Sequence, residues 1–207
     1  VAEKPIKKIV LATENLGAPA PSYLQAGQRR TRYIASEYLK DNGYTILPDY
    51  HFDNAWKQAL RTYGSAYDPT TGKIDTDSWR AAMIITATSI RDNTDADAIV
   101  FVDVFEHEVS HGYGMKHYAR FYGVNRKPAL KGPGSGVPID FDWYQPIKAA
   151  SVMVTIYDVN LNRIFISRGG IDTLYAIDIK SSNPKFIRKK KLLDDEDDIE
   201  EGIELAF

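Results

Sequence analysis

The chain has 207 residues, of which 43% are hydrophobic and 26% charged, a profile typical of a folded globular domain with its own core. The formal net charge of -2 excludes a general basic field, so we expect no nucleic-acid partner. The absence of cysteine excludes disulfides, thiolate metal sites and cysteine nucleophiles, and no apolar run approaches the roughly 20 residues of a transmembrane span.

The first elements predict an alternation of strand and helix. A short apolar run predicts a strand over Lys7–Glu14. Apolar residues at helical spacing then predict a helix from about Gln25 to Asn42, with Gly43 where a C-terminal cap belongs. A short second strand is expected at Tyr44–Pro48, closed by its proline.

Two further helices are expected before the middle of the chain. The first starts near Asp53 and ends at Gly64, because its apolar residues recur at helical spacing. The second follows a turn-rich stretch and starts with Thr76 or Asp77 as its N-cap.

The texture changes after residue 97. Ala98–Phe105 is dense in valine, isoleucine and phenylalanine, which favours a strand. A return strand is expected within Gly114–Val124, and a glycine-rich loop follows at Lys131–Pro138. Ala150–Asp158 alternates between two faces, and the turn after it predicts a hairpin with Arg163–Ser167.

This order of elements predicts an α/β (α+β) fold, with a mixed β-sheet flanked by helices. We expect a single domain over residues 1–207. It carries an inserted β-hairpin and loop region at about 106–146 and a C-terminal helix at about 194–207.

One stretch, HEVSHGYGMKH, matches the pattern H-E-x-x-H-x-x-G-x-x-H and so resembles the zinc-binding signature of the metzincin peptidases. In that interpretation His107, His111 and His117 bind Zn, Glu108 is the general base and Gly114 forms the turn. This zinc metallopeptidase is our alternative hypothesis for function. A non-catalytic surface metal site using two of the histidines is a weaker alternative.

The zinc chemistry depends on a helix. Residues four apart lie on one face of a helix at about 6 Å along its axis, but on a strand they are about 13 Å apart. Because β-branched residues dominate the run before His107, we expect a strand and therefore a histidine-bearing hairpin without zinc. A metzincin also needs a methionine turn, and Met153 lies within a predicted strand instead.

Aromatic residues concentrate in the segment FDWYQP. Tryptophan and tyrosine are good anchors for a binding surface, so Phe141, Trp143 and Tyr144 are candidate binding residues for a protein or glycan. The alternative is a loop that packs its aromatic rings on the sheet.

Three stretches resemble a family of bacterial envelope proteins: KKIVLATE with the helix ending in DNGYTILPD, the phrase ADAIVFVDV, and the hairpin ASVMVTIYDVNLNRIFIS. The family includes the curli-secretion lipoprotein, the activator lipoproteins of penicillin-binding proteins and the N-terminal domain of the TolB translocation protein. The resemblance covers most of Lys7–Ser167 in element order.

The resemblance implies a fold like the TolB N-terminal domain, export from a bacterium, and a location in the periplasm or anchored at the outer membrane. It also implies a lipid anchor on an N-terminal cysteine, which we expect to have been removed from this chain, and no enzymatic activity. The expected function is binding to other envelope proteins. A related hypothesis is a subunit that self-associates through the same α/β domain.

Overall fold

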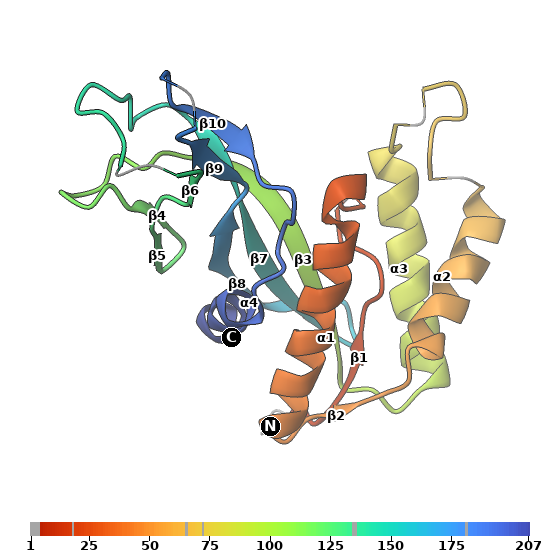
Figure 1. The fold of residues 1–207 in the computed structure, drawn as a ribbon. Helices are drawn as coiled ribbons and strands as arrows, with labels where there is room; N and C mark the ends of the chain where they lie inside the picture. Colours follow the sequence, from red (N-terminus) through yellow and green to blue (C-terminus); the bar gives the residue numbers. More distant parts are fainter. Residues whose placement is uncertain (1–4, 18, 65, 72, 134–135, 181) are drawn as a thin grey trace. The chain divides into compact units, whose positions relative to one another are not determined.

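The computed structural model describes residues 5–17, 19–64, 66–71, 73–133, 136–180 and 182–207 (Figure 1). The chain divides into two compact units. Unit 1 comprises Val1–Pro21, Arg32–Asp103 and Met153–Ser167, and unit 2 comprises Ser22–Thr31, Val104–Val152 and Arg168–Phe207.

Unit 1 is built on parallel strands. β1 (Lys8–Leu11) pairs in parallel with β2 (Thr45–Ile46) and with the first residues of β3 (Ala98–Val109). In the β1–β3 ladder Ile9 lies opposite Ala98, and the register continues through the buried end of β1. The parallel connections are made by helices, as parallel strands require.

Helix α1 (Gln25–Asp41) follows the short 3-10 turn η1 (Ser22–Leu24), and its second half belongs to unit 1. Helices α2 (Tyr50–Tyr63) and α3 (Thr76–Asn93) pack against one face of β1 and β3. In Figure 1, β1 runs between α1 on one side and α3 on the other. The core beneath α2 and α3 includes Val10, Phe52, Trp56, Trp79, Ile90, Ile99 and Phe101.

The helix boundaries differ slightly from the predicted ones. α2 begins at Tyr50, three residues before the expected start. α3 begins at Thr76, and its N-cap is Asp75, whose carboxylate accepts hydrogen bonds from the backbone N–H groups of Asp77 and Ser78. An N-cap side chain of this kind satisfies backbone donors that have no partner within the helix.

The predicted hairpin is present as β7 (Ile147–Asp158) and β8 (Arg163–Thr173). Asp158 organises its turn, because its carboxylate accepts hydrogen bonds from the backbone N–H groups of Asn160 and Asn162 at 2.8 Å each. The main sheet has the strand order β2-β1-β3-β7-β8. The predicted mixed α/β fold is therefore confirmed.

Unit 2 contains five short strands and the C-terminal helix: β4 (Ala119–Phe121), β5 (Val124–Arg126), β6 (Leu130–Lys131), β9 (Tyr175–Asp178), β10 (Lys185–Arg188) and α4 (Glu196–Ala206). β9 pairs with β10 in antiparallel and with β6 in parallel orientation, and β4 pairs with β5. Across the described ranges, no helix has both the length and the apolar character needed to cross a membrane.

The predicted return strand at Gly114–Val124 is wrong for most of its length. Within it, Ala119–Phe121 forms β4 and Val124 begins β5, and these two strands pair with each other rather than returning along β3. Positive φ angles at Gly114 (69°) and His117 (53°) break the extended chain before it. In the glycine-rich loop expected at Lys131–Pro138, Gly134 and Ser135 lie outside the described residues.

Helix α4 approaches β8 so closely that only glycine fits at the crossing. A Cβ atom at Gly169 would overlap the carbonyl oxygen of Gly202 and lie 2.7 Å from its carbonyl carbon. Arg126 ties the same region together: its Nε donates to the Ile171 carbonyl at 2.5 Å, and Nη1 donates to Glu201 at 2.6 Å. The docking of α4 therefore rests on backbone proximity and on one mostly buried guanidinium.

Candidate functional site

The zinc-peptidase motif does not have the geometry its chemistry needs. β3 continues to Val109, so His107 lies within a strand, and the helix that the alternative hypothesis required through His107–His111 is absent. Adjacent strand residues point to opposite faces, which separates Glu108 from the face of His107. Within the described part of the chain, no three histidine, aspartate or glutamate side chains form a group able to hold a metal ion.

His107 is engaged with a buried serine. Its Nε2 lies 2.7 Å from Ser151 Oγ, and its ring packs against Phe121 and Tyr122 with centroids 5.3 and 5.0 Å away. Burial lowers the pKa of His107. A histidine–serine pair is the core of many hydrolases, but Ser151 is completely buried, so this hydroxyl is not presented to a substrate.

His111 is completely buried, and its ring stacks on Phe186 at a centroid distance of 5.7 Å. Neither ring nitrogen has a hydrogen-bond partner among the described residues. Burial lowers the pKa of His111 to about 4, with smaller contributions from the positive charges of Lys189 and His117. The imidazole is therefore neutral at physiological pH.

The other residues of the motif have separate surroundings. Glu108 is exposed and accepts a hydrogen bond from Lys148 at 3.3 Å. His117 stacks on the Trp143 ring with centroids 4.1 Å apart and an angle of 5° between the planes. Gly114 lies in the turn between Tyr113 and Tyr118, whose backbone N–H and carbonyl groups form hydrogen bonds with each other. The motif thus forms the end of β3 and the loop that follows it, rather than a metal centre.

Two loops of unit 2 come together and expose large apolar side chains. We call this the aromatic loop surface and define it by these residues: Tyr113, Met115, His117, Ile139, Phe141, Trp143 and Tyr144. Met115 and Ile139 are fully exposed, and Tyr144 is 74% exposed. The three predicted binding residues are all members of this surface.

Contacts beneath the surface hold the two loops together. The backbone N–H of His111 donates to the Trp143 carbonyl at 3.1 Å. Phe141 packs against Trp143 and against Phe186, with centroids 5.0 and 5.3 Å away. The Tyr144 ring covers Gly112 so tightly that a Cβ atom there would overlap it. The rings of His117, Phe141, Trp143 and Tyr144 are therefore held by contacts between and beneath the two loops.

Sequence reasoning missed a buried acid in unit 1. Asp103 lies in β3 on the same face as Phe101, is 6% exposed, and accepts hydrogen bonds from the Leu16 N–H at 3.0 and 3.2 Å. Burial raises the pKa of Asp103 to about 7, and the Leu16 hydrogen bond opposes the rise. The sequence carried a signal for this residue, because Asp103 lies between two valines of a predicted strand and acidic side chains are rarely buried.

Comparisons of the chain with models of protein families, with curated proteins and with solved structures find no match.

Proposed function

We propose that the protein is a non-catalytic component of a bacterial envelope that binds another envelope protein through the aromatic loop surface. The proposal that this surface binds a partner rests on the exposure of Met115, Ile139 and Tyr144. These residues lie on two loops that contact each other through buried and stacked groups. The envelope location and the exported, lipid-anchored form rest on the resemblance of three sequence stretches alone.

Two properties support a protein as the partner. Single exposed apolar residues are normal, but large apolar and aromatic side chains exposed on two loops that contact each other are typical of recognition surfaces. Preorganised aromatic anchors lose little side-chain entropy on binding, which improves affinity at a given contact area. Lys116 and Asp142 are exposed charged residues of opposite sign within the two loops, as in the polar rim of a protein interface.

The zinc motif supplies no catalytic group to this proposal. The one histidine–serine pair on the former zinc motif has its hydroxyl buried, and the motif histidines each contact a different partner. The aromatic loop surface itself offers rings and a thioether rather than an arrangement of acid, base and nucleophile.

Site-specific photo-crosslinking tests the proposal. p-Benzoylphenylalanine replaces Tyr144 in one variant and Tyr33, an exposed tyrosine of α1 in unit 1, in a matched control. In cells of the bacterium that makes the protein, we expect the Tyr144 variant to crosslink to one envelope protein that the Tyr33 variant does not reach. Adding Trp143→Ala is expected to abolish that product.

The other outcomes decide against the proposal or redirect it. A crosslink from Tyr144 to a second copy of the chain, with a dimer in sedimentation, supports the self-associating subunit in place of a heterologous binder. Equal products from both variants, or no product from either, overturn the aromatic loop surface as the binding site.

A further inference from the structure

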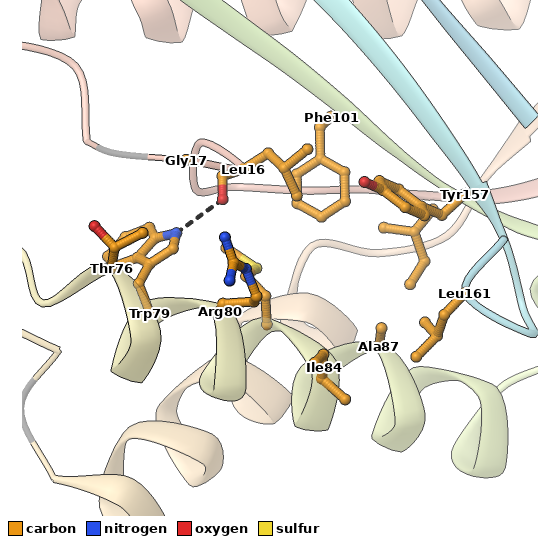
Figure 2. Close-up of a pocket in the computed structure, with 12 residues that line it drawn as sticks. Leu16, Gly17, Thr76, Trp79, Arg80, Ile84, Ala87, Phe101, Tyr157 and Leu161 are labelled. Atoms are coloured by element: carbon orange, nitrogen blue, oxygen red, sulfur yellow. Dashed lines mark hydrogen bonds between the residues drawn. The ribbon is translucent and has the colours of Figure 1, made fainter. Parts of the chain in front are cut away.

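A second feature, in unit 1 and independent of the aromatic loop surface, is a cavity of about 440 Å³. It opens between α3, the segment that follows β1, and the end of the β7–β8 hairpin (Figure 2). Its volume lies within the usual range for small-molecule sites.

The cavity lining is mainly apolar. Leu16 and Phe101 form one side, Met83 comes from α3, and Tyr157 and Leu161 come from the hairpin end. Phe101 and Tyr157 meet edge to face with centroids 6.1 Å apart, and Figure 2 shows the Tyr157 hydroxyl directed toward Phe101. A ligand with an apolar body is stabilised against such a surface, because binding removes apolar area from water.

Hydrogen bonds hold both the N–H and the carbonyl of Leu16, which lies in one wall of the cavity. The Leu16 N–H donates to the buried Asp103 carboxyl group, and the Leu16 carbonyl accepts from Trp79 Nε1 at 3.0 Å, the dashed line in Figure 2. The Trp79 side chain is almost completely buried. The wall is therefore formed before any ligand arrives, which reduces the entropic cost of binding.

Arg80 is the single charged residue among the described residues that line the cavity. Its side chain is 71% exposed, and its nearest ion-pair partner, Asp77, lies 3.9 Å away, beyond hydrogen-bond range. Figure 2 shows the guanidinium directed toward the Leu16–Gly17 segment across the opening. Its planar N–H donors match a carboxylate, which can accept two of them at once.

We propose that this cavity binds a small apolar carboxylate. The apolar body of roughly 10 to 15 heavy atoms lies against Phe101, Tyr157 and Leu161, and the carboxylate pairs with Arg80 at the opening. The size follows from the cavity volume, the apolar body from the lining, and the charge from Arg80. The proposal concerns binding, and no covalent step is involved.

Calorimetric titration of the full chain with sodium octanoate tests this proposal, with 1-octanol as the uncharged counterpart. We expect one octanoate per chain. Arg80→Gln is expected to weaken octanoate binding by about threefold to tenfold and to leave octanol binding unchanged. The control Arg91→Gln removes an exposed arginine from the same helix, outside the cavity, and is expected to change neither.

Ala87→Leu locates the site. Ala87 lines the cavity from α3, and its side chain faces the opening in Figure 2, so a larger residue occupies the space of the ligand. Both probes are expected to lose binding in this variant, and NMR resonances of the Leu16 and Leu161 methyl groups are expected to shift when octanoate is added to the unmodified chain.

Three results would overturn the proposal. They are the absence of octanoate binding to the unmodified chain, equal effects of Arg80→Gln and Arg91→Gln, and methyl shifts confined to residues away from the cavity. Because Arg80 is exposed, its variant folds like the unmodified protein and keeps the test valid even where Ala87→Leu perturbs α3.

Discussion

His111 and Phe186 stack with an angle of 13° between their rings, and the histidine is buried with both nitrogens unpaired among the described residues. The histidine that sequence patterns mark as a zinc ligand thus occupies the place of an apolar ring. Its neutral form is the one the fold accommodates, because burial holds its pKa at about 4.

His111→Phe is expected to stabilise the protein in mild acid. The pKa of His111 is near 6.5 in the unfolded chain but about 4 in the folded chain. Between these pH values the unfolded chain binds the proton and the folded chain does not. The free energy of unfolding therefore falls as pH drops from 6.5 toward 4. The variant should gain roughly 2 kcal/mol at pH 4.5 relative to pH 7. Urea unfolding at both pH values measures this, and His51→Phe is the control.

Asp103→Asn is expected to show the opposite pH dependence. The folded protein holds the proton on Asp103 up to about pH 7, whereas the unfolded chain releases it near 3.8, so stability falls as pH rises between these values. The amide cannot ionise and still accepts the Leu16 hydrogen bond. The variant should therefore gain stability relative to the unmodified protein from pH 4 to pH 7. A constant difference between the two would contradict the assignment.

Gly169→Ala is expected to lower the free energy of unfolding by about 2 kcal/mol or more, because the added methyl group collides with the Gly202 backbone. Gly17→Ala is the matched control, since a Cβ atom there meets nothing within 4 Å. Thermal unfolding compares the two. Equal melting temperatures would show that α4 and β8 are farther apart than described.

Arg126→Lys is expected to cost about 1 to 3 kcal/mol of stability. Lysine keeps the charge but cannot bond the Ile171 carbonyl and the Glu201 carboxylate together, as the guanidinium does. Arg120→Lys, which alters an exposed arginine on the neighbouring strand, should change the unfolding midpoint little. A similar loss in both variants would indicate that only charge matters.

Zinc is expected not to bind in a one-to-one ratio. The three motif histidines are engaged with Ser151, Phe186 and Trp143 respectively, and none of these contacts brings the imidazoles to one point. Dialysis against zinc followed by metal analysis should give the same content for the unmodified chain and for a His107→Ala, His111→Ala double variant. One zinc per chain, lost in the variant, would revive the peptidase hypothesis.

Local patterns were sufficient for most of the fold. The β-branched run at Ala98–Phe105 predicted a strand, and apolar spacing predicted the helix that spans Gln25–Asp41. The start of α2 was missed because Tyr50–Phe52 follow a proline and carry no N-cap hydrogen bond from the preceding Asp49 side chain. The return strand predicted within Gly114–Val124 was wrong for most of its length, because His117 adopts a positive φ that its residue type does not indicate.

The site was only partly predictable. Composition pointed to Phe141, Trp143 and Tyr144, yet the stacking of Trp143 on His117 depends on two loops 26 positions apart in the chain meeting in space. The cavity combines segments separated by still longer stretches of chain, so neither its volume nor the role of Arg80 follows from any local pattern.

The interleaving of the two units has an evolutionary consequence. The chain passes between them after Pro21, Thr31, Asp103, Val152 and Ser167, and several of these points lie inside helices or strands. No single cut yields either unit whole, so gene fusion or exon exchange cannot transfer the cavity without the aromatic loops. The two features are therefore expected to be inherited together.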